Sequence, residues 1–251
     1  MSRPLSASHL SLAPIHADVW HADALAGASA QVVATGDATL DVQLPGGGWP
    51  VGALTELLQP PGVHSEWRLL LPALARCGHG PVVLVGAPHT PFAPALTAQG
   101  LHTSRLLWVT AQAGAARLWA AEQALRCAPV DAVLLWLPAA RGEAARGEAV
   151  RADQLRRLQL AAAEHHKLLF AMRAGAAQHE ASPAALRLGV APVPDSDALE
   201  VQVLKRRGPP LAQPLRIAAR PARLALLLAA HTLSAGSPRR SDALDRVATT
   251  A

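Results

Sequence analysis

The sequence contains no tyrosine and only two cysteines, and no part of it forms a long apolar run. Two cysteines are too few for a disulfide framework or a zinc site, so Cys77 and Cys127 are expected to be buried thiols in a reducing compartment. The apolar run 224–230 is far shorter than the roughly 18 to 20 residues that a membrane-spanning helix needs. The first residues also lack the continuous apolar segment of a signal peptide. We therefore expect a cytoplasmic protein without a membrane partner.

The chain has enough apolar sequence for a sizeable core. Of its 251 residues, 51% are hydrophobic, which suits one large domain with additional terminal segments. We expect an N-terminal segment over 1–29 with a short amphipathic helix at about 17–25, a folded domain over 30–233, and a flexible basic tail over 234–251.

The middle of the chain alternates short apolar runs with longer helical patterns. Such runs are typical of strands that are buried on both faces. Strands are predicted at 53–58, 82–85, 106–109, 132–136, 168–172, 186–191, 199–204 and 215–218, and helices at about 66–76, 92–98, 113–126, 150–166 and 221–233. The pattern predicts an α/β fold with a mostly parallel, twisted sheet, helices on both of its faces, and antiparallel C-terminal strands after residue 185.

Charge is distributed unevenly along the chain. Residues 201–240 contain eight basic and no acidic side chains, so the remainder is mildly acidic although the formal net charge is +5. Such a segment either binds nucleic acid or an acidic partner, or forms an ordinary solvated strand edge and tail. No aromatic side chain lies among these basic residues to stack on nucleic-acid bases. Both interpretations stay open.

The turn at 59–66, between the first buried strand and the helix after it, stands where a phosphate-binding loop is expected. A P-loop needs the pattern G-x-x-x-x-G-K-[ST], in which backbone N–H groups and a lysine hold the phosphates and a hydroxyl binds Mg²⁺. The turn reads Gln-Pro-Pro-Gly-Val-His-Ser-Glu, so it contains no lysine, and Gly62 is its only glycine. The sequence therefore predicts the scaffold of a nucleotide site without its chemistry.

Two further stretches carry a resemblance to a known family. The first combines Thr35-Gly36, Leu40-Asp41 and the turn Leu44-Pro45-Gly46-Gly47-Gly48-Trp49-Pro50, and the second is Val203-Leu204-Lys205-Arg206-Arg207-Gly208-Pro209-Pro210. Together with the altered turn, they resemble the RecA/SulA-like family, in particular the ImuA group of RecA-related accessory proteins in bacterial mutagenic translesion synthesis. The resemblance covers residues 30–220 and implies a RecA-like core with a degenerate P-loop.

The resemblance also implies that the P-loop residues needed for ATP hydrolysis are missing. Gln59 and His64 stand at its two glycine positions, Ser65 at its lysine position and Glu66 at its hydroxyl position. A carboxylate at Glu66 would repel a triphosphate where a cation is needed. We therefore expect no bound cofactor at this turn.

Three other positions of the RecA-type site are altered as well. Trp136-Leu137-Pro138 stands where the Mg²⁺-binding aspartate is expected, Pro88 where the catalytic glutamate is expected, and Arg173 where the nucleotide-sensing glutamine is expected. Because phosphoryl transfer needs these groups together, we expect no catalytic residues and no enzymatic activity. Trp49 and Trp67 flank the altered turn, and we expect them to fill the former nucleotide site.

By resemblance, the chain is a non-catalytic adaptor in the mutagenic translesion synthesis of the SOS response. Its implied partners are ImuB, a Y-family-like polymerase homologue, and RecA, with a mutagenic replicative-type polymerase engaged indirectly and DNA contacted weakly. The implied location is the cytoplasm, with association to the nucleoid after DNA damage. Two alternatives remain: a diverged RecA-like ATPase of DNA repair, and a SulA-like inhibitor of cell division.

Contact residues are expected in the basic C-terminal part. Lys205 and Arg207 match the two residues with which a RecA subunit reaches its neighbour's nucleotide, so Lys205, Arg206 and Arg207 are candidates for a contact in trans. The alternative is that this strand pairs with nearby carboxylates, namely Asp195, Asp197 or Glu200. Candidates for DNA or partner contacts are Arg173, Arg216, Arg220, Arg223, Arg239 and Arg240.

Overall fold

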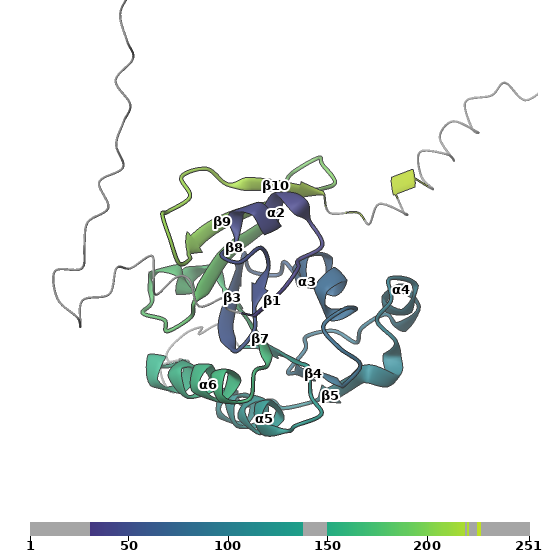
Figure 1. Ribbon diagram of the computed structural model, residues 1–251, viewed down its shortest axis with the longest axis vertical. Coiled ribbons are helices and arrows are strands. Elements are labelled where there is room, and N and C mark those ends of the chain that lie inside the picture. The colour runs from purple at the N-terminus through teal and green to yellow at the C-terminus, as the bar shows by residue number, and fades with distance from the viewer. Residues whose placement is uncertain (1–30, 138–149, 219, 221–224, 227–251) are drawn as a thin grey trace, which may run out of the picture.

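The computed structural model describes residues 31–137, 150–218, 220 and 225–226, which form an α/β domain (Figure 1). The N-terminal segment with its expected helix at 17–25 and the tail 234–251 lie outside the described residues. The helix expected at 221–233 lies largely outside them. Among the helices of the described part, none has the length and apolar character that crossing a membrane requires.

Eight strands form the central sheet, in the order β10-β9-β8-β3-β7-β6-β4-β5. Their bounds are β3 Ala53–Gln59, β4 Val82–Val85, β5 Leu106–Val109, β6 Ala132–Trp136, β7 Leu168–Ala174, β8 Leu186–Pro192, β9 Ala198–Lys205 and β10 Leu215–Ala218. Every predicted strand is present. The sheet is mostly parallel, as the continuous apolar runs indicated, because β9 alone runs against the other seven strands.

The predicted antiparallel extension is correct for the β8–β9 and β9–β10 pairs and wrong where it joins the sheet. There β8 runs parallel to β3, with Leu57 opposite Leu188. The reason is the connection after β7, which passes through a short 3-10 helix, η3 (Gly175–His179), before β8 begins in the same direction. This connection carries the chain past β3, so that β7 and β8 flank β3 and both run parallel to it. Parallel strands need such a crossover, whereas antiparallel neighbours can be joined by a tight turn.

Helices cover both faces of the sheet. Their bounds are α3 Glu66–Leu74, α4 Ala93–Ala98, α5 Gly114–Arg126 and α6 Ala152–Glu164, with a 3-10 helix, η1, at Thr103–Arg105. α5 and α6 pack against each other on one face, whereas α3 packs on the opposite face (Figure 1). The four predicted helical patterns in this part of the chain are therefore confirmed to within about two residues, the usual uncertainty of helix ends.

The central strands β3, β4, β6 and β7 each contribute to two separate cores, because successive side chains point to opposite faces. In β4, Val82 and Leu84 belong to the core under α3, and Val83 and Val85 belong to the core under α5 and α6. This double burial explains why the strand sequences are continuously apolar rather than alternating.

Residues 32–50 form a small unit on the α3 face. β1 (Val32–Val33) pairs with β2 (Trp49–Pro50), and between them lies α2 (Ala38–Gln43). α2 begins at Asp37, whose carboxylate accepts a hydrogen bond from the backbone N–H of Leu40 (3.0 Å). The unit packs into the core under α3 through Leu40, Leu44 and Trp49.

The two thiols differ in their surroundings. Cys77 is partly buried, whereas Cys127 is exposed at the end of α5. The prediction of two buried thiols is therefore wrong for Cys127. Burial raises the pKa of the Cys77 thiol, and the neighbouring Arg105 reduces this effect through its hydrogen bond and its charge.

Candidate functional site

Polar side chains meet at the carboxyl ends of β3 and β6, where α3 begins. Gln59 is the last residue of β3, and Trp136 is the last residue of β6. The side-chain oxygen of Gln59 accepts a hydrogen bond from the backbone N–H of Ser65 (2.7 Å), and its Nε2 donates to Glu66 Oε2 (3.0 Å). Trp136 Nε1 donates to the other carboxylate oxygen, Glu66 Oε1 (3.0 Å). Neutral donors from two strands therefore hold the Glu66 carboxylate.

Glu66 is only 1% exposed and stands in the first turn of α3. The free N–H groups and the dipole of a helix favour a negative charge at its N-terminus. The ion pairs found among the described residues do not include Glu66. The chain thus places its own carboxylate at the point where a strand–loop–helix unit would bind an external anion.

Trp136 is positioned by an arginine of α5. Arg117 Nη1 donates to the backbone oxygen of Trp136 (2.9 Å), and its Nε donates to the backbone oxygen of Ala111 (2.8 Å). The side chain reaches these acceptors by crossing Gly86, which follows β4 with a φ of +68°. A Cβ at Gly86 would lie 2.6 Å from Arg117 Nε, so a larger residue would push the arginine away from Trp136.

A second buried carboxylate lies on β3. Glu56 is fully buried, and its two oxygens accept hydrogen bonds from Arg173 Nη1 (3.0 Å) and Arg187 Nε (2.6 Å). Arg173 also bonds to Glu180 (2.6 Å), and Arg187 donates to the backbone oxygen of Ala177 in η3 (2.6 Å). Two carboxylates and two guanidinium groups therefore balance in charge, and the cluster ties β3, β7 and β8 to the crossover.

This cluster corrects the expectation for Arg173. Its side chain is only 6% exposed, and both ends of its guanidinium group are engaged by carboxylates. In this arrangement Arg173 is not available to DNA or to a partner. Its position at the end of β7 is the one that the sequence indicated, but the group it faces is Glu56 rather than a nucleotide.

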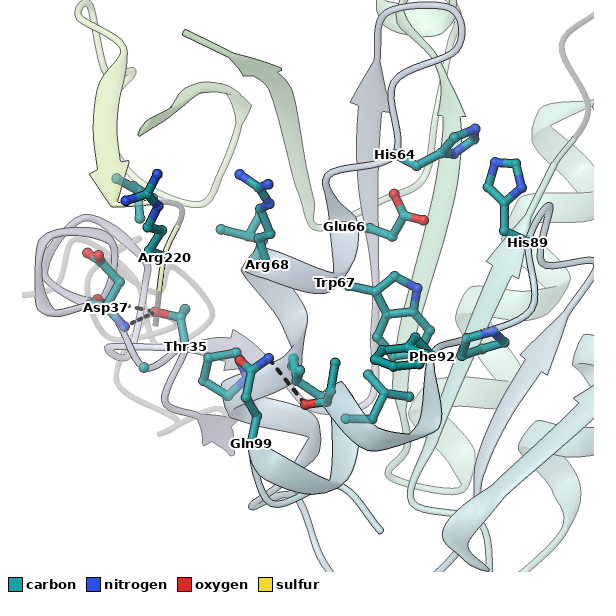
Figure 2. A pocket seen from close by; sticks show the side chains of 18 of the residues that line it. Thr35, Asp37, His64, Glu66, Trp67, Arg68, His89, Phe92, Gln99 and Arg220 are labelled. Atoms are coloured by element: carbon teal, nitrogen blue, oxygen red, sulfur yellow. Dashed lines mark hydrogen bonds between the residues drawn. The ribbon is translucent and has the colours of Figure 1, made fainter. Parts of the chain in front are cut away.

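A cleft with a volume of about 970 Å³ lies beside α3. Figure 2 shows His64 and His89 at one end, Trp67 and Phe92 in the middle, and Arg220 with Asp37 at the other end. The lining also includes the apolar residues Leu71, Pro72, Leu96 and Ile217. Glu66 and Trp136 line the cleft as well, so the buried carboxylate lies along its wall.

The residues of the altered turn have different surroundings. Gln59, Ser65 and Glu66 are buried in the hydrogen-bonded network, whereas Gly62 and His64 are exposed. His64 stacks edge-on against His89, with ring centroids 4.9 Å apart. Among the described residues, no group of three or more His, Cys, Asp and Glu side chains could hold a metal ion.

The expectation that Trp49 and Trp67 fill the site is wrong. Trp49 packs edge-on against Phe170 in the core, with ring centroids 5.4 Å apart. Trp67 tilts against Trp136 and forms part of the wall of the open cleft. The group that stands at the N-terminus of α3 is instead the Glu66 carboxylate.

The basic strand β9 ends in side chains with different roles. Lys205 is exposed, and its Nζ donates to the backbone oxygen of Ser182 (3.0 Å). Arg206 donates to the backbone oxygens of Gln43 and Pro209 and so ties the end of β9 to α2. Arg207 is exposed. In the described part of the chain, the ion pairs of Asp195, Asp197 and Glu200 do not include these three residues.

The other candidate contact residues are only partly described. Arg216 is exposed on β10, opposite Glu200 in the register, and Arg220 forms an ion pair with Asp197. Arg223, Arg239 and Arg240 lie outside the described residues.

Sequence reasoning missed Glu56, Glu180 and Arg187. A signal was present, since Glu56 interrupts the apolar run of β3 and Arg187 interrupts that of β8. A charge inside a strand that is buried on both faces needs a partner of opposite charge. What the sequence does not provide is the pairing of β3 with β8, which brings two residues together that are 131 positions apart.

The arrangement is that of an α/β domain with its polar network and its cleft at the carboxyl ends of parallel strands, where ligands of such sheets generally bind. The chain matches no protein-family model. A search of curated proteins also finds no match.

Proposed function

We propose that this protein is a non-catalytic, RecA-like adaptor in SOS-linked mutagenic translesion synthesis, equivalent to the ImuA group. Its partners would be an ImuB-like polymerase homologue and RecA, and through them a mutagenic replicative-type polymerase. Its site of action would be the nucleoid after DNA damage.

The observation that carries the proposal is the position of the Glu66 carboxylate. A triphosphate bound at the N-terminus of α3 would meet a buried negative charge that already accepts hydrogen bonds from Gln59 and Trp136. The loop before it offers no lysine to offset that charge. Because like charges at contact distance repel strongly in a buried site, this place favours the chain's own anion over a nucleotide.

The layout of the sheet is consistent with a RecA-like core. Counted from β3, the strands lie in the order 3-2-4-5-1-6-7-8, and only the seventh is antiparallel. The loop at 60–65 follows the first and most central of these strands and leads into α3, which is the setting of a P-loop. A scaffold of this kind without the groups for phosphoryl transfer suits a protein that binds rather than catalyses.

A contact in trans with RecA would use the end of β9. Lys205 and Arg207 are exposed, and the Nζ of Lys205 donates to the backbone oxygen of Ser182. Neither side chain takes part in an ion pair with another described residue. We expect the double variant Lys205→Ala/Arg207→Ala to bind RecA filaments at least tenfold more weakly, since two charged contacts of roughly 1 kcal/mol each would be lost. The matched control is Lys167→Ala/Arg156→Ala, which removes the same charges elsewhere and should bind normally. Unchanged association of the first variant would contradict the contact.

The function itself is tested by partner binding and by mutagenesis. The purified chain should bind its genome's ImuB-like polymerase homologue, and deletion of its gene should lower the frequency of damage-induced mutations. A wild-type copy should restore that frequency. Mutagenesis that is unaffected by the deletion would overturn the proposal, and filamentation of cells on overexpression would favour the division inhibitor instead.

A further inference from the structure

The cleft beside α3 has an apolar surface that nothing in the described part of the chain covers. Phe92 is 70% exposed on one wall, and Trp67 forms part of the wall beside it (Figure 2). Leu71, Leu96 and Ile217 line the cleft as well. Large apolar side chains gathered in a hollow of this size are typical of a surface that binds another apolar group.

The chain itself leads into this cleft after its last strand. Ile217 and Ala218 of β10 line the cleft, and so do Arg220 and Ala225 farther along. The next residue, Leu226, is 71% exposed. The sequence then continues with Leu227, Leu228, two alanines and, after two polar residues, Leu233. An apolar stretch therefore starts at the mouth of an apolar cleft.

The spacing of these leucines suits a groove of this kind. Leu224, Leu227 and Leu228 stand at i, i+3 and i+4, which places their side chains on one face of a helix. A helix with one apolar face binds by laying that face in a hydrophobic groove. An apolar helix face and an apolar cleft both gain free energy when they leave water together, so burial of such a face in this cleft is favourable.

Proximity decides between this segment and other occupants. A segment joined to the cleft by a few residues acts at an effective concentration of about millimolar, far above the level of most proteins in solution. A second copy of the chain or a partner has to compete with that. Since Ala225 already lines the cleft, the segment that follows it has the shortest route to the apolar lining residues.

We propose that residues 227–233 dock in the cleft of their own chain, with Leu227 and Leu228 against Trp67 and Phe92. The cleft is then an intramolecular peptide-binding groove, and an apolar segment of another protein reaches it only by displacing residues 227–233. This inference stands apart from the proposed function, because it concerns the cleft and makes no use of the Glu66 network.

The test measures paramagnetic broadening in the full chain. A ¹⁵N-labelled protein with Cys77→Ala and Cys127→Ser receives a nitroxide at Thr232→Cys, and the indole N–H signals of its tryptophans are recorded with the label oxidised and then reduced. The matched variant adds Leu227→Asp and Leu228→Asp. Trp119 serves as the internal reference, because it is exposed on α5 and so lies over the opposite face of the sheet.

Docking predicts that the Trp67 signal loses most of its intensity, that Trp119 keeps its intensity, and that the aspartate variant restores Trp67. Equal broadening of Trp67 with and without the aspartates would show a tethered but undocked segment and overturn the proposal, as would the absence of broadening. A mixture of nitroxide-bearing chains with ¹⁵N-labelled chains that lack the label should leave Trp67 unchanged. Broadening in that mixture would mean that a second copy occupies the cleft.

Discussion

Two carboxylates lie buried within ten residues of each other, and the protein neutralises them in different ways. Glu56 faces two arginines and takes part in a charge-balanced cluster on the side of the sheet that α6 covers. Among the described residues, the Glu66 carboxylate accepts hydrogen bonds from the neutral donors Gln59 and Trp136, and Glu66 stands in the first turn of α3. The first carboxylate is matched by full charges, whereas the second is matched by dipoles.

The difference separates a carboxylate that is balanced by charges on its own sheet from one that stands at the start of a helix. An ion cluster that is balanced by its own strands has no need of a ligand, and Glu56 serves to join β3, β7 and β8. A helix N-terminus at the carboxyl end of a central strand is a general anion site, and here the anion belongs to the chain. Substitutions at or beside each carboxylate test this difference, and we expect them to lower the free energy of unfolding by different amounts.

The largest effect is expected at Glu56. Glu56→Gln keeps the shape of the side chain but leaves Arg173 and Arg187 buried without an adequate counter-charge, so we expect the free energy of unfolding to fall by about 3–5 kcal/mol. Urea titration followed by circular dichroism measures this change. The control is Glu180→Gln, which removes the half-exposed partner of Arg173 and should cost about 0–1 kcal/mol. A loss at Glu56 no larger than the loss at Glu180 would contradict the account of the cluster.

A smaller effect is expected at Trp136. Trp136→Phe removes the donor to Glu66 and leaves a buried carboxylate oxygen without its partner, which costs about 1–3 kcal/mol beyond the loss of packing. Trp49→Phe is a matched control, since Trp49 is also buried but its Nε1 has no hydrogen-bond partner in the described part of the chain. The difference between the two unfolding free energies isolates the bond to Glu66. Equal losses would mean that this bond does not hold the carboxylate.

The smallest effect concerns Cys77, where burial and a neighbouring arginine act in opposite directions. Burial is the stronger influence and raises the pKa of the Cys77 thiol, so less reactive thiolate is present at pH 8 than in an unperturbed cysteine. Iodoacetamide should therefore modify Cys77 more slowly than the exposed Cys127, as followed by mass spectrometry. In concentrated urea the two rates should converge. Faster modification of native Cys77 would show that Arg105 outweighs burial.

Much of the fold could be predicted from the sequence because its signals are local. The apolar runs at 53–58 and 132–136 are buried strands, and the helical pattern at 113–126 became α5. α2 was not predicted, since it has only six residues and depends on the cap at Asp37. The predicted antiparallel direction of β8 relative to the sheet was wrong. That direction depends on which strand β8 pairs with, and no local pattern encodes the pairing.

The candidate site could be predicted only in part. The sequence indicated Gln59, Glu66 and Trp136 as departures from a nucleotide site, and the structure shows that these three side chains bond to one another. The sequence also indicated Arg173 as a contact residue, and this was wrong. The partner of Arg173 is Glu56, which lies 117 positions away on a neighbouring strand, and no local pattern shows that pairing. The cleft was not predicted, since its walls come from segments that meet only in the folded chain.

The most direct test of the central claim is nucleotide turnover by the purified chain, measured alone and together with RecA on single-stranded DNA. If the Glu66 carboxylate takes the place of a phosphate, the chain should hydrolyse no ATP by itself and should add nothing to the turnover of RecA. Turnover that can be attributed to this chain would contradict the account and would give the lead to the diverged ATPase.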